Sequence, residues 1–251
     1  MTVYFIGAGP GDPELITVKG QRLLRSCPVI LYAGSLVPTA VLNGHSAELL
    51  VNTAELHLDE IIRLIRQAHE QGQDVARVHS GDPSLYGAIG EQIRHLRALA
   101  IPFQIIPGVT ATAACAALLE SELTLPDVSQ TLILTRYASK SDMPAGEQLH
   151  DLARHGATMA IHLGVVHLGK IVAELLPHYG ADCPTAVVHR ASWPDQDWVS
   201  GTLADIEALV SAKGFRRTAL ILVGRVLNAQ DFADSALYHA EHRHLFRGQD
   251  V

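Results

Sequence analysis

The sequence predicts an α/β protein of two domains, in which the first sheet is mainly parallel and the second is mixed. Short apolar segments alternate with segments of helical periodicity from the first residues onward, and this alternation favours a parallel sheet covered by helices. In the second half, two strand-like segments are separated only by a turn through Trp193 and Pro194. A connection this short joins antiparallel strands, so we expect at least one hairpin in the second sheet.

The first half alternates strictly between the two patterns. We expect strands at residues 3–6, 29–32, 74–79 and 103–106, and helices at residues 18–26, 57–71, 89–100 and 110–119. Thr17 is a suitable N-cap for the first helix, and Pro28 follows its end. The second helix carries apolar residues on one face and ends at Gly72; these residues are Leu58, Ile61, Ile62, Ile65 and Ala68.

The second half contains the pattern of a mixed sheet with one strong helix. We expect strands at residues 131–135, 158–163, 185–189, 197–200 and 219–223, and a helix at residues 168–179. We place the domain boundary at residue 112, giving an N-terminal domain of residues 1–112 and a C-terminal domain of residues 113–251. The active site is expected in the cleft between them.

Composition narrows the class of protein. The chain has 251 residues, of which 48% are hydrophobic, and a formal net charge of −7, which argues against a nucleic-acid partner. Its apolar runs are shorter than the roughly 18 residues that a membrane span needs, and its N-terminus lacks the basic segment of a signal peptide. The 3 cysteines are isolated from one another, so we expect no disulfide framework and no metal site. These features predict a cytoplasmic protein.

The most informative segment is SGDPSLYG, residues 80–87. It follows a predicted strand and precedes a helical pattern, which is where open α/β sheets bind their ligands. Gly81 allows a ligand to approach the backbone, and Pro83 stiffens the turn. Asp82 adds a carboxylate, which would repel a phosphate but suits a cationic or hydroxyl-bearing ligand.

Two other loops follow predicted strands. GAGPGD, residues 7–12, resembles a dinucleotide fingerprint, but Asp12 stands where GxGxxG requires its third glycine, and Pro10 removes one N–H donor. This loop is therefore either a strained turn or a substrate loop, and a nicotinamide or flavin cofactor is the weaker alternative. PGVTA, residues 107–111, places Thr110 as a helix N-cap. Its spacing predicts that it lies at the same sheet edge as SGDP.

In this order and spacing, GAGPGDPELIT, SGDPSLYG and PGVTA resemble the tetrapyrrole methylase family. The resemblance runs over nearly the whole chain and implies a methyltransferase that uses S-adenosyl-L-methionine (SAM) and releases S-adenosyl-L-homocysteine. The family binds SAM in a folded-up form between two α/β domains. The matching positions imply that SAM contacts Pro10, Ser80, Gly81, Asp82, Tyr86, Thr110, Ala111, Leu163 and Ala186.

Within the family, LYAGSLVP (residues 31–38), HRASWPDQ (189–196) and LYHAEHRHLFR (237–247) resemble members that methylate carbon 11 of precorrin-4 or of its cobalt form in cobalamin biosynthesis. The implied substrate is an anionic macrocycle, and the relatives imply a homodimer. Alternatives are a methylase acting at another macrocycle carbon and a non-catalytic tetrapyrrole carrier.

Substrate carboxylates require Arg and Lys side chains. Arg136, which follows a predicted buried strand, is the first choice, and the other predicted substrate contacts are Tyr32, Ser35, Lys140, Arg190 and Arg247. For the removal of a proton before or after methyl transfer, the predicted base is Asp12, on the first glycine loop. The histidines of the tail, His239, His242 and His244, lack an acidic or cysteine partner, so they are not interpreted as a metal site.

Overall fold

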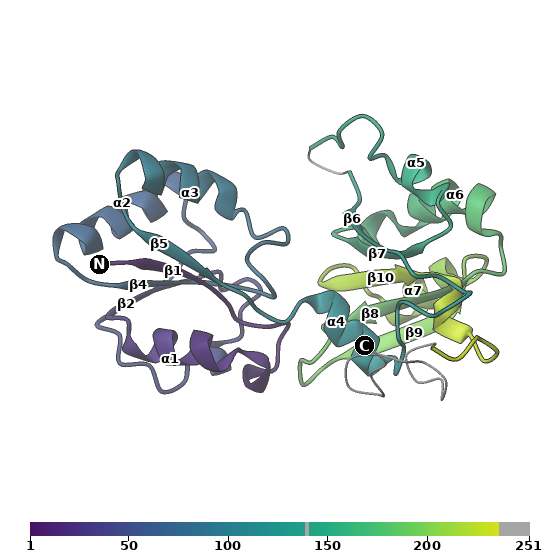
Figure 1. Ribbon diagram of the computed structural model, residues 1–251, viewed down its shortest axis with the longest axis horizontal. Helices are drawn as coiled ribbons and strands as arrows, with labels where there is room; N and C mark the ends of the chain where they lie inside the picture. The colour runs from purple at the N-terminus through teal and green to yellow at the C-terminus, as the bar shows by residue number, and fades with distance from the viewer. Residues whose placement is uncertain (139–140, 236–251) are drawn as a thin grey trace, which may run out of the picture. The chain divides into compact units, whose positions relative to one another are not determined.

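The computed structural model describes residues 1–138 and 141–235, which form two compact units (Figure 1). Unit 1 comprises Met1–Leu118 together with Arg190–Asp197, and unit 2 comprises Leu119–His189 and the chain from Trp198 onward. The predicted boundary at residue 112 lies inside helix α4 (Ala111–Leu118), and the assignment of functional domains stays a prediction. Among the described residues, no helix is both long enough and apolar enough to cross a bilayer.

Unit 1 contains a parallel sheet, as predicted. Its strands lie in the order β3-β2-β4-β1-β5, and every pairing is parallel. Their bounds are β1 (Val3–Gly7), β2 (Val29–Tyr32), β3 (Leu49–Asn52), β4 (Val75–His79) and β5 (Phe103–Ile106). Because β1 is flanked by β4 and β5, the loops that follow these three strands leave the sheet next to one another.

Helices cover both faces of the first sheet (Figure 1). Helices α2 (Leu58–Glu70) and α3 (Ile89–Ala98) bury one face, where Phe5, Leu31 and Ile65 are fully enclosed. Helix α1 (Val18–Ser26) and the 3₁₀ turn η2 (Thr39–Leu42) cover the other face. Thr17 caps α1 as predicted, since its hydroxyl accepts a hydrogen bond from the Gly20 N–H.

Unit 2 contains a mixed sheet, which confirms the prediction. The strands lie in the order β6-β7-β10-β8-β9; β6 is parallel to β7, and β10 is antiparallel to both β7 and β8. Their bounds are β6 (Leu132–Arg136), β7 (Thr158–His162), β8 (Pro184–His189), β9 (Asp197–Thr202) and β10 (Ala219–Val223). Helices α5 (Leu149–Ala153), α6 (Leu168–Tyr179) and α7 (Ile206–Lys213) supply apolar residues to the core on one face of this sheet.

Three elements were not predicted, and one residue lies differently from its prediction. The elements without a predicted counterpart are β3, α5 and α7, which have 4, 5 and 8 residues respectively. Arg136 is the last residue of β6 and not the residue after the strand. The remaining 3₁₀ turns are η1 (Pro13–Leu15), η3 (Val165–His167) and η4 (Arg225–Asn228).

Candidate active site

Three glycines bring the loops after β1, β4 and β5 into direct backbone contact. A Cβ on Gly7 would lie 2.6 Å from the Cα of Gly108, and a Cβ on Gly108 would clash with the Gly81 carbonyl oxygen. Gly9 and Gly81 also exchange backbone hydrogen bonds of 3.3 and 2.8 Å. No other residue type fits at Gly7 or Gly108 without moving a neighbouring loop. The predicted meeting of the SGDP and PGVTA loops at one sheet edge is therefore confirmed.

Asp82 joins two of these loops. One carboxylate oxygen accepts a hydrogen bond of 2.7 Å from the Ser84 N–H, and the other accepts one of 2.9 Å from the Gly108 N–H. Partial burial opposes ionisation, but the hydrogen bonds from Ser84 and Gly108 outweigh it and hold the pKa of Asp82 below its ordinary value. The loop edge of the sheet therefore carries a fixed negative charge at neutral pH.

The segment Arg190–Asp197 packs on the first glycine loop. The indole N–H of Trp193 donates a hydrogen bond of 2.8 Å to the Pro10 carbonyl, and the hydroxyl of Ser192 accepts one of 3.0 Å from the Asp12 N–H. The indole lies so close to Gly11 that a Cβ there would clash with the ring. The GAGPGD loop is thus shaped by residues about 180 positions away in the chain.

Arg190 stabilises this segment from within. Its guanidinium lies 4.0 Å from the centroid of the Trp193 ring, a distance typical of a cation–π contact. Its Nε also forms an ion pair of 2.9 Å with Asp195. Arg190 was predicted to contact substrate, and in this structure its charge already has a carboxylate partner.

Asp12 begins the short η1 turn. Its Oδ1 accepts a hydrogen bond of 2.8 Å from the Glu14 N–H, so the carboxylate is held in one orientation. Its other oxygen makes no hydrogen bond within the described residues. That oxygen is the one available for the predicted role as a base.

The remaining predicted SAM contacts of unit 1 lie on the same loops. Tyr86 is 45% exposed and adopts a left-handed conformation with φ of +57°. Ser80 directly precedes Gly81, and Pro10 directly follows Gly9. Thr110 caps α4 as predicted, because its hydroxyl accepts a hydrogen bond of 3.2 Å from the Ala113 N–H. Ala111 is the first residue of that helix.

In unit 2 the predicted residues have different environments. Leu163 directly follows β7, is 62% exposed and has a φ of +57°, which is unusual for a leucine. Ala186 is only 2% exposed and pairs with Leu222 in the centre of the sheet. The Arg136 guanidinium donates hydrogen bonds to Ser141 and to the Asp142 carbonyl, so it orders its own loop. Lys140, Arg247 and the tail histidines lie outside the described residues.

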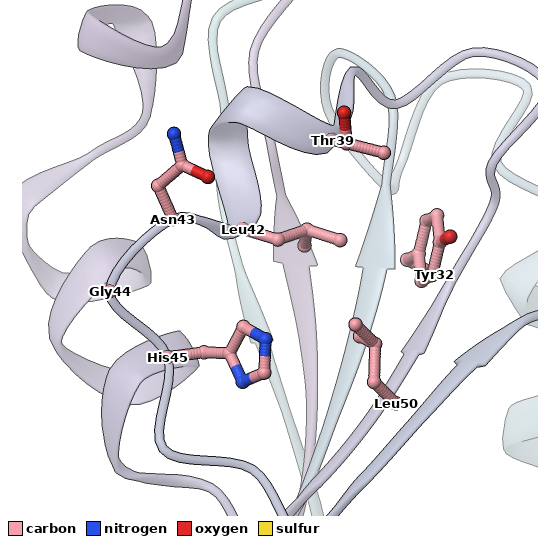
Figure 2. Close-up of a pocket in the computed structure, with 7 residues that line it drawn as sticks. All are labelled: Tyr32, Thr39, Leu42, Asn43, Gly44, His45 and Leu50. Carbon is pink, nitrogen blue, oxygen red and sulfur yellow. The ribbon is translucent and has the colours of Figure 1, made fainter.

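A pocket of ≈ 330 Å³ lies beside β2 and β3 (Figure 2). Tyr32, a predicted substrate contact, forms part of its wall; Ser35 belongs to the turn after β2 and is not one of the lining residues. The other lining residues are Thr39, Leu42, Asn43, Gly44, His45 and Leu50. His45 Nδ1 accepts a hydrogen bond of 3.1 Å from the Ala47 N–H, which leaves Nε2 as the protonated nitrogen of the neutral ring.

The model of the tetrapyrrole (corrin/porphyrin) methylases matches residues 2–207. The chain belongs to this family. It is 76% identical over 247 residues to the precorrin-4 C(11)-methyltransferase of Pseudomonas aeruginosa, an alignment that covers 98% of this chain and 99% of the relative.

Solved structures of methyltransferases also match the chain over most of its length. A cobalt precorrin-4 methyltransferase matches with a TM-score of 0.88 and 42% identity, over 91% of this chain and 96% of that chain. The uroporphyrin-III C-methyl transferase of Thermus thermophilus, complexed with S-adenosyl homocysteine, matches with a TM-score of 0.74 and 31% identity, over 90% and 99%. The predicted family and two-domain fold class are confirmed.

Some residues of this tetrapyrrole methylase that shape the site were not found from the sequence. Trp193 was predicted to lie in a turn, and Ser192 belongs to the HRASWPDQ motif, but no pattern indicated that they contact the first glycine loop. His45, Asn43 and Thr39 line the pocket but show no recognisable spacing. For these residues, only the fold brings the side chains together.

Proposed function

We propose that this protein transfers the methyl group of SAM to carbon 11 of precorrin-4, or of its cobalt form, in cobalamin biosynthesis. The observation that carries the proposal is the 76% identity, over 98% of the chain, to a precorrin-4 C(11)-methyltransferase. A likeness of this extent includes both glycine loops, the HRASWPDQ segment and the tail. The product formed from SAM in this reaction is S-adenosyl-L-homocysteine.

The loops of unit 1 suit SAM better than a nucleotide with phosphates. A phosphate requires N–H donors and positive charge, whereas here Pro10 lacks an N–H and Asp82 is held ionised. When bound, SAM supplies a methyl group on a positively charged sulfonium. An ionised Asp82 at the loop edge favours such a cation, and the open space beside Gly81, where a Cβ would meet nothing nearer than 3.8 Å, leaves room for a ligand.

The residues proposed to bind SAM are those implied by the family resemblance. They are Pro10, Ser80, Gly81, Asp82, Tyr86, Thr110 and Ala111 from unit 1, with Leu163 and Ala186 from unit 2. Their task is to fix the donor in one orientation, since positioning of the two reactants supplies most of the rate in such a transfer. Ala186, being buried, would contribute through the packing of β8 and not through direct side-chain contact.

Asp12 is the proposed base. Its Oδ1 is occupied by the Glu14 N–H, and its free oxygen can accept a proton that the macrocycle loses before or after methyl transfer. Tyr32, Ser35, Arg136, Lys140 and Arg190 are the proposed substrate contacts. Arginine is suited to the carboxylates that surround a tetrapyrrole because its N–H groups match both oxygens of a carboxylate.

The cellular setting is part of the same proposal. We propose that the enzyme is cytoplasmic, as its sequence features predict, and that it acts as a homodimer, as the family resemblance implies. Size-exclusion chromatography with light scattering would measure the mass directly, and a monomer of 27.1 kDa would contradict the dimer.

The function is tested by supplying purified protein with methyl-labelled SAM and either precorrin-4 or cobalt-precorrin-4. We expect stoichiometric release of S-adenosyl-L-homocysteine and a new methyl signal on carbon 11 by NMR. A methyl on another carbon would identify a different methylase of the family. Pigment binding without S-adenosyl-L-homocysteine formation would indicate a carrier.

A further inference from the structure

A buried arginine with uncharged partners lies in the middle of the strand that leads into the SGDP loop. Arg77 of β4 is only 5% exposed, and its position in the sheet is between Phe5 of β1 and Leu31 of β2. Its hydrogen bonds end on the Gln92 side chain and on the carbonyls of Leu31 and Val78. Burial alone lowers the pKa of Arg77 to about 10, so the chain tolerates an unfavourable environment for this charge.

Gln92 connects Arg77 to the loop, because its side chain makes hydrogen bonds to both. It is 4% exposed, and its Oε1 accepts a hydrogen bond of 3.1 Å from Arg77 Nε. Its amide nitrogen donates one of 3.0 Å to the carbonyl of Ala88. Because arginine can only donate, this partner fixes the orientation of the amide, and with it the donor that faces Ala88.

Ala88 is the point where the loop enters α3, and it is strained. Its φ is +50°, and that of Tyr86 is +57°, a left-handed conformation that residues with a Cβ rarely adopt. Such conformations persist only where surrounding contacts enforce them. The far end of the loop is therefore held from the interior, on the side opposite to solvent.

We propose that Arg77 and Gln92 are positioning residues that hold the Ser80–Ala88 loop in the shape that binds SAM. This inference rests on the proposed function, since it requires that the loop contacts SAM. Neither side chain touches the ligand in this proposal; Arg77 orients Gln92, and Gln92 holds the strained Ala88 carbonyl.

Gln92→Glu separates positioning from general stability. The carboxylate keeps an acceptor for Arg77 Nε and adds an opposite charge beside it, so folding stability should be retained or raised. It has no N–H for the Ala88 carbonyl, so the loop is released. We expect the thermal midpoint to stay at or above that of the parent, while calorimetry shows S-adenosyl-L-homocysteine affinity falling about three- to tenfold, the loss of roughly one hydrogen bond.

Gln67→Glu is the matched control. Gln67 accepts a hydrogen bond of 3.3 Å from Arg63 on the exposed face of α2, so this variant makes the same change of partner far from the loop in sequence. Its S-adenosyl-L-homocysteine affinity should equal that of the parent. Adding Ala88→Gly to Gln92→Glu should recover most of the lost affinity, because glycine adopts a positive φ without strain.

The outcomes are distinguishable. If the parent does not bind S-adenosyl-L-homocysteine, the proposed function fails. If the parent binds and Gln92→Glu binds equally well, the positioning role is overturned. Should Gln92→Glu not fold, the double variant Arg77→Met/Gln92→Met replaces both partners with apolar groups of similar length. It must likewise weaken binding, and parental affinity in that variant would refute the inference.

Discussion

The contact between Gly11 and Trp193 predicts a reversal in the effect of one substitution. In the parent protein, Gly11→Ala puts a methyl group against the indole ring, and overpacking of this kind costs about 1–3 kcal/mol of folding stability. Gly11 is not among the residues with a positive φ, so alanine fits its backbone conformation. Once the ring is absent, Gly11→Ala should be neutral or stabilise by about 0.4–1 kcal/mol, because alanine restricts the unfolded chain.

Trp193→Ala carries its own cost. It removes the hydrogen bond to Pro10, worth about 1 kcal/mol, the contact with Arg190, worth about 0.5–1 kcal/mol at a partly exposed site, and the packing of the ring. The single variants should therefore both destabilise. The double variant should be no less stable than Trp193→Ala, which gives a coupling free energy of about 2 kcal/mol.

Urea unfolding of the four proteins, followed by far-UV circular dichroism, measures this cycle. Additivity of the two single changes to within about 0.5 kcal/mol would mean that the indole does not rest on Gly11, and would refute the arrangement of the HRASWPDQ segment described above. Trp198→Phe is a suitable control, since Trp198 is 43% exposed on β9 and should leave the effect of Gly11→Ala unchanged.

The remaining predictions concern the site residues. Asp12→Asn should lower turnover strongly and leave S-adenosyl-L-homocysteine affinity within about twofold; parental turnover would remove Asp12 from the mechanism. Gly81→Ala should cost about 1–2 kcal/mol of stability for its φ of +62°, and calorimetry should show a larger loss of ligand affinity than of stability if SAM occupies the space beside it. Arg136→Ala should raise the KM for the tetrapyrrole and not that for SAM, while an equal rise in both would indicate that it only orders its own loop. Burial and then the charge of Arg77 lower the pKa of His79 from 6.5 to about 3. The unfolded chain therefore takes up a proton first, and stability should fall as the pH drops below 6.5, by up to about 1.4 kcal/mol per pH unit. In urea titrations His79→Asn should flatten this slope, and an unchanged slope would contradict the burial of a neutral ring.

Elements with residues buried on both faces were predictable. All five residues of β4 are buried, and the run of apolar side chains in β2 and β10 indicated interior strands with bounds close to those observed. The missed strand β3 is an edge strand, with Leu49 and Leu50 about 40% exposed, so it lacks both the buried run and the alternation that reveal strands. Helix α5, with 5 residues, is too short for two full turns, so no repeat of an apolar face could reveal it.

The burial of polar side chains was harder to predict from the sequence. In the segment DVARVH, Arg77 and His79 alternate with valines and an alanine, a pattern typical of a strand with one solvated face. The structure buries both side chains. Helices cover this face, and the hydrogen bonds of Arg77 to Gln92 and Leu31 offset part of the cost of burying its charge. Partners this distant in sequence leave no signal in the local pattern.

The glycines of the three loops are required for different structural reasons. Gly7 and Gly108 are required by contact between neighbouring backbones, so any protein with this sheet and these loops needs them, whatever it binds. Gly81 has space around its Cα and is needed only for its backbone conformation or for a ligand. The glycines therefore identify the fold of the loops. The chemistry of the ligand is indicated by what accompanies them, a proline without an N–H and a carboxylate held in its ionised form, which together disfavour a phosphate and favour a cation.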